Sequence, residues 1–432
     1  MRLLFTAFGS PGDVIPVLAI AEAAVRRGHE CLALLNPADE HLAASRGVSC
    51  RAYGTRWTTA AIGEHPAWLD AKRGSLSMLR ELMAPRASEL APALREAVAW
   101  FEPKAVVHHQ ASFGVAWATE PSGVPRVTVS VAPAAWPSVS DPNLYPPMPD
   151  LDSYPSWTIR LGSVFGRRAV NRAVDPALNA ARRELGMPPS RRFMFDEQMN
   201  AALNIGMWSP GYRGPTEDDP ANAVITGFPG VVRGGLTADA EAGRRDLERF
   251  EAWAAERGER PIVAMSLGTT AAYAGLDQAG LGAEIAERVG VGVVVLGGIG
   301  GEGEGGGRGV RGEVLRLGFV PHGAVLPRCA AVVHHGGIGT VAQTLRAGKP
   351  AVVAPFTHDQ PDNARRLRLL GLGVPVGRRE LRKGGLWRAV ERVVSDGGFG
   401  SRAAAFAERL CEEDGGAAAT VAIEERIGGG GD

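Results

Sequence analysis

One glycine-rich turn in the second half of the chain has the residue types needed to hold a phosphate group. Residues 331–340 read AVVHHGGIGT, an apolar run followed by two histidines, three glycines and a helical pattern over Val341–Arg346. Glycines at such a turn leave backbone N–H groups uncovered at the positive end of a helix dipole. His335 can donate to a phosphate oxygen, and Thr340 can do the same or cap the helix. The alternative is a tight turn whose glycines are only structural, and the adjoining histidine favours phosphate binding over it.

A second polar cluster lies downstream of the glycine turn. Residues 355–364 read PFTHDQPDNA and follow the apolar run Ala351–Ala354, which is typical of a buried strand. Beyond this strand, Asp359 supplies a charged acceptor, and Gln360 supplies an amide that both accepts and donates. Such a pair matches the vicinal hydroxyls of a sugar, although Asp359 is equally suited to cap the next helix.

A carboxylate also lies where the first strand of the chain should end. The apolar run Arg2–Phe8 predicts a buried strand, and the turn GSPGDV at residues 9–14 leads into a helical pattern over Val14–Arg27. Asp13 therefore sits in a glycine-flanked turn, from which its carboxylate can take a proton from a substrate hydroxyl. Its alternative role is an ordinary N-cap of the following helix.

Two adjacent histidines are candidates to assist this base. His108 and His109 come at the end of the predicted strand Ala105–His108, whose carboxyl end should lie near that of Arg2–Phe8. An imidazole beside Asp13 would tune the pKa of the carboxylate. The alternative is a strand end whose polar atoms are satisfied locally.

Apolar runs alternate with helical patterns in two series, which is typical of parallel sheets covered by helices. Further predicted strands are Glu30–Leu35, Arg126–Val131, Ile262–Ser266, Gly292–Leu296, Leu315–Phe319 and Ala331–His334. Trp136–Arg160 is dense in proline and aromatic residues and reads as an irregular loop, and the glycine-rich run Gly297–Gly312 reads as a mobile one. We therefore expect an α/β protein with two doubly wound domains, whose ligands bind at the carboxyl ends of the strands.

The length of 432 residues favours two domains, and a polar stretch rich in proline and glycine separates the two series. We expect an N-terminal domain over residues 1–215 and an interdomain linker over 216–245. A C-terminal domain should follow over 246–405, with a C-terminal helix and a disordered tail over 406–432.

Composition argues against several classes of function. Lys+Arg and Asp+Glu both number 47, and a net charge of zero does not favour nucleic acid as a partner. The four cysteines are scattered without a CxxC pair, so no metal site is expected. No stretch reaches the ~18 uncharged apolar residues of a membrane span, and the N-terminal apolar run is too short for a signal peptide. We expect a soluble, cytoplasmic protein with no integral membrane segment.

Three motifs in the same order give a family resemblance. The stretch from FVPH at residues 319–322 to Asn363, with its HHGGxGT and DQ elements, resembles the donor-binding signature of inverting family-1 glycosyltransferases. The bacterial antibiotic and sterol-type branch is the most similar. Residues 9–16 look like that branch's GSRGDVxP motif, and Val263–Thr269 looks like its VSFGS turn. The resemblance covers essentially the whole chain and implies the GT-B fold, two Rossmann-like domains facing across a cleft.

The resemblance also implies a donor site in the C-terminal domain. Its candidate residues, in chain order, are Ser266, Thr269, Phe319, Val320, His335, Gly337, Gly339, Thr340, Asp359 and Gln360. The diphosphate of the donor would lie on the glycine turn. Its nucleobase would pack against residues 319–320, and its sugar would contact Asp359 and Gln360.

Asp13 stands at the position of the catalytic base in this branch, with His109 as its candidate partner. Two departures from the family pattern bear on substrate choice. Pro11 replaces the usual arginine, and Thr357 stands where an aromatic residue is common, next to the sugar position. The identity of the sugar therefore stays open.

The expected activity is transfer of a hexose, with inversion, from a UDP- or dTDP-sugar to a hydroxyl of a lipophilic small-molecule acceptor. UDP-glucose is the first donor to consider, as a co-substrate, and no other cofactor is implied. One alternative is a nucleotide-sugar epimerase on the same fold, which needs further carboxylates around the sugar. Another is a non-catalytic nucleotide-sugar-binding protein, against which the intact Asp13 argues. A dinucleotide-dependent oxidoreductase is disfavoured, because residues 9–12 lack the GxGxxG order and Asn36, which is not acidic, follows the second strand.

Overall fold

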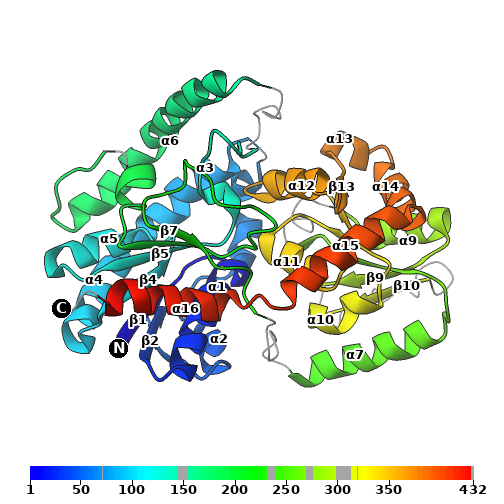
Figure 1. The fold of residues 1–432 in the computed structure, drawn as a ribbon, viewed down its shortest axis with the longest axis horizontal. Helices are drawn as coiled ribbons and strands as arrows, with labels where there is room; N and C mark the ends of the chain where they lie inside the picture. The colour runs from blue at the N-terminus through cyan, green and yellow to red at the C-terminus, as the bar shows by residue number, and fades with distance from the viewer. Residues whose placement is uncertain are drawn as a thin grey trace. The chain divides into compact units, whose positions relative to one another are not determined.

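The chain folds into two compact units in the computed structural model (Figure 1). The structure describes residues 1–70, 72–144, 154–191, 193–230, 240–268, 276–297, 313–318 and 320–429. The first unit comprises Met1–Val232 and Glu413–Asp432, and the second comprises Arg233–Glu412.

The first unit is built around a seven-stranded parallel sheet in the order β3-β2-β1-β4-β5-β6-β7. Its strands are β1 (Arg2–Thr6), β2 (Glu30–Leu35), β3 (Ser49–Ala52), β4 (Ala105–His109), β5 (Arg126–Ser130), β6 (Leu203–Gly206) and β7 (Ala223–Ile225). Its helices are α1 (Pro11–Arg26), α2 (Glu40–Ala44), α3 (Gly74–Met78), α4 (Ala84–Phe101), α5 (Gly114–Thr119), α6 (Ser156–Glu184) and α16 (Gly415–Ile423). The strand order reverses between β1 and β4, which is where doubly wound sheets bind ligands.

Both faces of this sheet are covered, which explains why its strands read as continuous apolar runs. Within β1, Leu3 and Phe5 pack against α1 and α16, and Leu4 packs on the opposite face against α4, α5 and α6. All three side chains are fully buried. The helices thus enclose the strands and leave the loops at the strand ends to carry the polar residues.

The second unit repeats this plan around a six-stranded parallel sheet in the order β10-β9-β8-β11-β12-β13. Its strands are β8 (Ile262–Ser266), β9 (Gly292–Leu296), β10 (Val314–Leu317), β11 (Ala331–His334), β12 (Ala351–Val353) and β13 (Gly373–Pro375). Its helices are α7 (Ala240–Ala255), α9 (Gln278–Val289), α10 (His322–Val325), α11 (Ile338–Arg346), α12 (Gln360–Leu369), α13 (Arg378–Leu381), α14 (Gly385–Ser395) and α15 (Gly397–Leu410). The switch point lies between β8 and β11, so β11 and α11 lie at the expected place for a ligand.

The predicted linker over residues 216–245 is wrong at both of its ends. Ala223–Ile225 forms β7, the edge strand of the first sheet, and pairs in parallel with β6. Helix α7 begins at Ala240, and the two units divide after Val232. A strand of three residues among prolines and glycines has too little apolar pattern to be distinguished from a linker.

The predicted C-terminal segment 406–432 also needs correction, because the structure divides it between the units. Helix α15 ends at Leu410 in the second unit, and α16 packs on α1 in the first, where Thr420 Oγ1 donates to the Ile20 carbonyl over 3.3 Å. The helical backbone continues over Glu424–Gly428, and residues 430–432 of the expected disordered tail lie outside the described residues.

Two expected loops have different outcomes. The stretch Trp136–Arg160 is not irregular throughout, because the 29-residue helix α6 begins at Ser156. Most of the glycine-rich run Gly297–Gly312 lies outside the described residues, which resume at Glu313.

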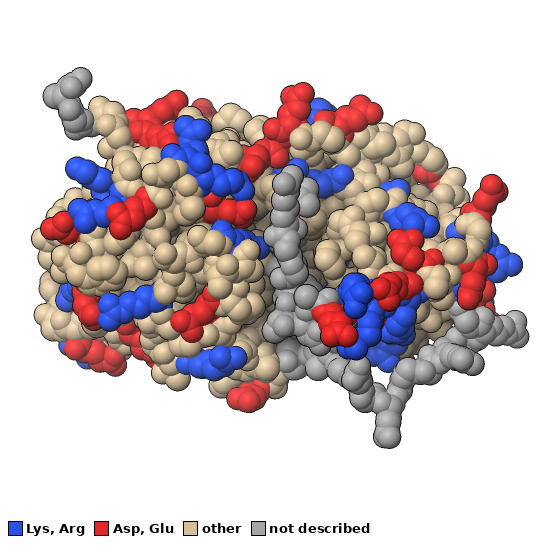
Figure 2. Space-filling view, turned by 90° about the horizontal axis from the view of Figure 1, so that it is seen from below, with Lys and Arg blue, Asp and Glu red and all other residues tan. Residues whose placement is uncertain are grey.

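Charge is evenly distributed on the face drawn in Figure 2. Acidic and basic side chains lie intermingled on it, with small groups of one sign next to groups of the other. This face therefore offers no broad basic surface of the kind that phosphate backbones require.

The end of the C-terminal helical segment is held by an ion-pair network that should make its docking depend on pH. Glu424 accepts bonds from Arg27 Nη2 at 2.6 Å and from His29 Nε2 at 2.6 Å. The Arg27 hydrogen bond, followed by the His29 bond, lowers the pKa of Glu424 from 4.5 to about 2. Because the folded pKa is depressed, this stabilisation is present above pH 4.5 and is lost as the pH falls toward about 2.

We therefore expect Glu424→Gln to lower the melting temperature at pH 7, by a margin that shrinks as the pH falls from about 4.5. Thermal unfolding of both proteins between pH 7 and pH 3 measures this margin. Glu425→Gln, which changes the exposed neighbouring carboxylate, is the matched control and should show no such margin. A margin that does not change with pH would contradict the assignment.

Candidate active site

The Asp13 carboxylate lies in the first turn of α1, directly after the carboxyl end of β1. The helix begins at Pro11, two residues beyond Gly9, so the predicted start at Val14 is wrong. Ser10 is the N-cap, and Asp13 Oδ2 accepts its backbone N–H at 2.7 Å and its hydroxyl at 2.9 Å. Asp13 is therefore the acidic member of a capping box and not the N-cap itself.

The other carboxylate oxygen of Asp13 remains available for chemistry. Asp13 Oδ1 lies 3.6 Å from His109 Nε2, and the Asp13 side chain is 31% exposed whereas that of His109 is 4% exposed. Gly9 makes room for this arrangement, because a Cβ there would lie 2.4 Å from Asp13 Oδ2 and its φ of +141° suits glycine. The carboxylate thus rests on a buried imidazole and presents one edge to solvent.

His109 is held in one tautomer by the backbone at the end of β4. Its Nδ1 accepts the Ala111 N–H at 3.4 Å, which leaves the ring proton on Nε2, the atom that faces Asp13. Burial lowers the pKa of His109, and the Asp13 charge and the Phe8 carbonyl oppose that shift only in part. A neutral imidazole keeps the negative charge of Asp13 uncompensated, as a base requires.

His108 does not share this role. Its side chain is fully buried, with Nδ1 3.1 Å from the His109 carbonyl and Nε2 3.1 Å from Thr128 Oγ1. Burial lowers its pKa to about 3, so the ring is neutral near pH 7. The alternative of polar atoms satisfied locally at the strand end therefore holds for His108, whereas His109 is the histidine beside Asp13.

A buried aromatic pair after β1 was not recognised in the sequence. Phe8, two residues beyond the end of β1, packs against Trp57 with ring centroids 5.2 Å apart, and both side chains are buried. Asn36 fixes this pair, because its Oδ1 accepts the Trp57 N–H at 3.0 Å and its Nδ2 donates to the Thr55 carbonyl at 2.8 Å. The Asn-Pro pair after β2 gave a signal for a turn, but nothing in the sequence indicated which segment its amide would bind.

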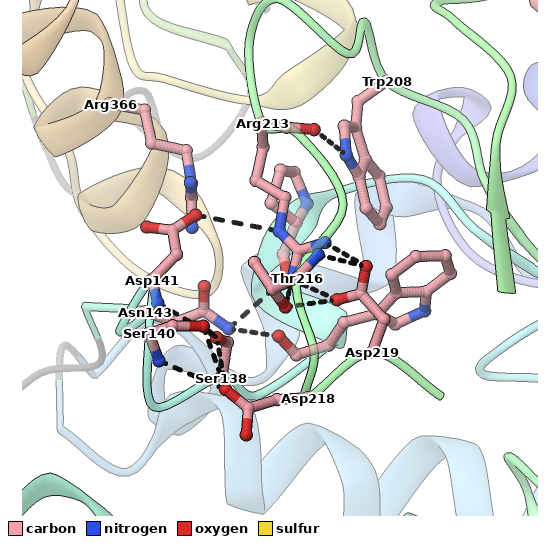
Figure 3. Close-up of polar contacts among 12 residues, drawn as sticks. Ser138, Ser140, Asp141, Asn143, Trp208, Arg213, Thr216, Asp218, Asp219 and Arg366 are labelled. Carbon is pink, nitrogen blue, oxygen red and sulfur yellow. Dashed lines mark hydrogen bonds and ion pairs between the residues drawn. The ribbon is translucent and has the colours of Figure 1, made fainter. Parts of the chain in front are cut away.

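A second missed feature holds the loop after β5 (Figure 3). The rings of Trp136 and Trp208 meet edge to face with centroids 4.7 Å apart. The Arg213 guanidinium lies over both, 5.7 and 5.9 Å from their centroids, and its Nη1 donates to Asp219 at 2.8 Å. Asp218 accepts the N–H groups of Val139 and Ser140 at 2.8 and 3.1 Å.

Burial alone would raise the pKa of Asp218, but these N–H groups and two serine hydroxyls lower it below its ordinary value. Residues 216–219, part of the predicted linker, thus fix the loop that follows β5 at the carboxyl edge of the first sheet.

In the second unit, the glycine turn after β11 is built around the His335 ring. His335 Nδ1 lies 3.4 Å from the Ser266 carbonyl at the end of β8. A Cβ at Gly268 would lie 3.1 Å from the ring, and one at Gly337 would lie 2.6 Å from Nε2. The two glycines therefore provide the space that the imidazole occupies, and Nε2 lies beside the start of α11.

The first turn of α11 is open. Gly337 is its N-cap, no side chain caps the helix, and a Cβ at Gly339 would meet nothing within 4 Å. Gly339 is exposed and Thr340 is partly exposed, so the backbone N–H groups of this turn can be approached from solvent. The geometry is that of a helix N-terminus suited to an anion.

His334 and Asn363 hold the turn from beneath. The buried His334 Nδ1 accepts the Gly336 N–H at 3.0 Å, and burial lowers the pKa of His334 to about 3. Asn363 Nδ2 donates to the Gly336 carbonyl at 2.9 Å and to Asp359 Oδ2 at 2.8 Å. One amide therefore links the glycine turn to the predicted sugar-binding carboxylate.

The DQ pair is less exposed than the sequence suggested. Gln360 is 5% exposed, and its Oε1 accepts the N–H groups of Phe356 at 2.8 Å and Thr357 at 3.2 Å. A substrate hydroxyl would therefore have to meet the Nε2 group of Gln360. Asp359 is partly exposed and precedes α12 as its N-cap residue, but its side chain makes no capping bond.

Thr357 is 1% exposed, so this departure from the family pattern is a buried side chain. The next residue, His358, has a φ of +59°, which is costly for a residue with a Cβ and occurs where the surrounding structure imposes it. No sequence pattern signals a left-handed histidine.

The remaining predicted donor residues have mixed outcomes. Ser266 ends β8 and is 9% exposed, and Val320 is 4% exposed in the core beside α10. Thr269 and Phe319 lie outside the described residues. Among the residues that the structure does describe, no group of three or more His, Cys, Asp or Glu side chains is arranged to hold a metal ion.

Comparison with known proteins relates the chain to glycosyltransferases. Residues 303–418 match the C-terminal domain described as Erythromycin biosynthesis protein CIII-like. Over 115 residues the chain is 39% identical to O-mycaminosyltylonolide 6-deoxyallosyltransferase of Streptomyces fradiae. The aligned segment covers 26% of this chain and 27% of that protein. The matched relatives are glycosyltransferases, and over residues 303–418 the chain resembles the antibiotic branch of the family-1 glycosyltransferases.

The likeness also extends over nearly the full length. An uncharacterised glycosyltransferase of Mycobacterium tuberculosis is 26% identical over 395 residues, which are 86% of each chain. The chain spans only about a quarter of the length of the Streptomyces relative. The solved structure of the glycosyltransferase VinC in complex with dTDP aligns with a TM-score of 0.66 at 18% identity and covers 100% of both chains. The chain therefore shares the GT-B fold of solved glycosyltransferase structures.

The space at Gly337 yields a test of the glycine turn. Gly337→Ala would place a Cβ 2.6 Å from His335 Nε2, so the ring must shift and we expect a loss of about 1–3 kcal/mol in the free energy of unfolding. Gly339 lies two residues further on, where an added Cβ would meet nothing within 4 Å, so Gly339→Ala should keep or slightly raise the free energy of unfolding. Denaturant unfolding of the two variants makes the comparison, and equal stabilities would contradict this geometry.

Proposed function

We propose that this protein is an inverting glycosyltransferase that moves a hexose from a nucleotide diphosphate sugar to a hydroxyl of a lipophilic small molecule. The first unit would activate the acceptor and the second would bind the donor. The observation that carries the proposal is the Asp13 carboxylate, which has one oxygen bound in the capping box and the other at a solvent-accessible edge above His109.

The proposed chemistry at Asp13 is proton removal. Asp13 takes the proton of the acceptor hydroxyl while the acceptor oxygen attacks the anomeric carbon of the donor. The bond from that carbon to the diphosphate breaks, and the nucleoside diphosphate leaves with the bonding electrons. His109, neutral and with its Nε2 proton toward Asp13, would position the carboxylate and would not take the proton itself.

The proposed chemistry in the second unit is charge stabilisation. The open first turn of α11 and His335 would bind the diphosphate, with Gly337, Gly339 and Thr340 in contact with its oxygens. Negative charge grows on the diphosphate as its bond breaks, so these donors would act most strongly in the transition state. The proposal requires no metal ion and no cofactor besides the nucleotide sugar.

The donor and acceptor classes are part of the proposal. UDP-glucose is the first donor to consider, and the dTDP found in VinC makes dTDP-sugars equally important to test. Asp359 and the Nε2 group of Gln360 would contact the sugar. A lipophilic acceptor is proposed from the resemblance alone.

Asp13→Asn tests the base. We expect kcat to fall by about 10²–10⁴-fold because the amide cannot take the acceptor proton, while dTDP and UDP bind with unchanged affinity. Turnover is measured with a panel of UDP- and dTDP-sugars and of phenolic, sterol and polyketide acceptors, with and without a chelator. Nucleotide binding is measured by calorimetry.

Asp13 also belongs to a capping box, so the melting temperature of the variant must be measured alongside. Glu120→Gln, which changes an exposed carboxylate after α5, is a control for the loss of one negative charge in the same unit. Unchanged turnover in Asp13→Asn would remove Asp13 from the mechanism.

His335 should make nucleotide binding depend on pH. Its Nδ1 proton points at the Ser266 carbonyl, and burial lowers its pKa, so Nε2 carries no proton in the free protein at pH 7. To donate to a phosphate oxygen from Nε2, the ring must gain a proton, which the diphosphate charge favours. Binding should therefore take up a proton and strengthen as the pH falls from 8 to 6.

His335→Ala should weaken dTDP or UDP binding by about tenfold or more, the effect of a lost charge-assisted hydrogen bond, and should remove the extra proton uptake. Calorimetry in buffers of different ionisation enthalpy counts the protons. His41→Ala, which changes an exposed histidine of the first unit, is the matched control. Identical pH profiles in the wild-type protein and in His335→Ala would overturn the phosphate assignment.

A further inference from the structure

The N-terminal half of α6 carries an exposed apolar stripe. Trp157, Leu161, Val164 and Phe165 are 67%, 52%, 41% and 59% exposed, and Tyr154, just before the helix, is 49% exposed. The spacing of the four helical residues places them on one face of the helix. Five of the nine exposed large hydrophobic side chains in the described part of the chain thus lie within twelve residues. Isolated exposed apolar residues are common, but such a cluster marks an interaction surface.

The same segment carries only positive charge. Arg160, Arg167, Arg168 and Arg172 are its charged residues, and no Asp, Glu or Lys occurs between Tyr154 and Val174. All four arginines are exposed, and none pairs with a carboxylate among the described residues. In a chain whose net charge is zero, this is a strong local excess.

The two halves of α6 differ in how they are held. In the C-terminal half, Val174, Leu178 and Ala181 are buried in the core that also contains α4 and α5. The N-terminal half projects from the first unit, away from its sheet (Figure 1). The C-terminal half of α6 is therefore packed in the core, and the apolar stripe on the N-terminal half is exposed to solvent.

We propose that the N-terminal half of α6 binds the surface of an anionic lipid bilayer. The stripe would insert its aromatic and aliphatic side chains at the level of the headgroups, and the arginines would bind lipid phosphates. Trp and Tyr favour this interface because one end of each ring is apolar and the other can bond to water. The proposal concerns attachment of the protein and does not depend on the proposed glycosyl transfer.

The helix would lie on the membrane and not cross it. None of the helices in the described ranges is apolar and long enough to span a bilayer, and α6 is interrupted by its arginines. This combination of a short apolar stripe and flanking basic residues is typical of interfacial helices.

Other occupants fit these residues less well. Pairing of this face with that of a second copy would bring eight arginines together without a carboxylate between them, which like-charge repulsion opposes. A small-molecule acceptor needs a concave site that buries most of its surface, whereas these side chains are 41–67% exposed on a helix that projects from the first unit. An anionic bilayer can bury the apolar side chains of the stripe and also bind the four arginines.

Vesicle co-sedimentation of the full-length protein tests the proposal. Wild-type protein should sediment with phosphatidylcholine vesicles that contain about one third phosphatidylglycerol, less with phosphatidylcholine alone, and less again at high salt. Trp157→Ser with Phe165→Ser should lower the partition coefficient on the order of tenfold or more, because both apolar anchors are lost. Arg167→Gln with Arg168→Gln should lower it comparably, and only for anionic vesicles.

Trp100→Ser is the matched control, because Trp100 is a 51% exposed tryptophan on α4 of the same unit. It should bind vesicles as the wild-type protein does. Circular dichroism and melting temperature confirm that each variant is folded, and sedimentation velocity without lipid reports the oligomeric state.

Three results would overturn the proposal. These are failure of the wild-type protein to bind anionic vesicles, equal binding by the Trp157→Ser/Phe165→Ser variant, and a wild-type dimer that the same variant dissociates. The last result would assign the stripe to self-association.

Discussion

Parallel strands joined by helical crossovers all end at the same edge of their sheet, and both candidate sites of this protein depend on that constraint. Asp13 follows β1 and His109 ends β4, which are neighbours in the first sheet although nearly a hundred residues separate them in the chain. In the second sheet, β8 and β11 are neighbours in the same way, and the Ser266 carbonyl thereby meets His335. The chemistry of each unit is therefore assembled by strand order, and the helices hold that order in place by covering both faces.

The sequence predicted those elements that the constraint makes regular. Strands buried on both faces need continuous apolar runs, so Glu30–Leu35, Ile262–Ser266, Gly292–Leu296 and Ala331–His334 are confirmed at both ends. Short edge strands have no such requirement. The three-residue strand β7 lies between proline and glycine and is only partly buried, and no local pattern records its pairing with β6, so only the folded sheet reveals it. The docking of α16 on α1 escaped prediction for the same reason, because it joins opposite ends of the chain.

For the candidate sites, residue types were predicted better than the hydrogen bonds in which they take part. The glycine turn could be recognised because helix termini and glycine have local requirements. Gln360 was expected to contact a ligand with its whole amide, but its oxygen already accepts two backbone N–H groups. Asp13 likewise serves the fold through one oxygen and leaves the other free. Such divided roles depend on which neighbours come within 3 Å, and a single sequence does not record those distances.

The amide of Asn363 joins the glycine turn to Asp359, with one nitrogen donating to both. Two parts of the proposed donor site that look separable along the chain are therefore one hydrogen-bonded unit. A substitution that moves Asp359 would displace the Gly336 carbonyl and alter the turn that precedes α11. Under the proposed function, a change of donor preference thus calls for concerted substitutions on both sides of Asn363, and their energetic effects should not add independently.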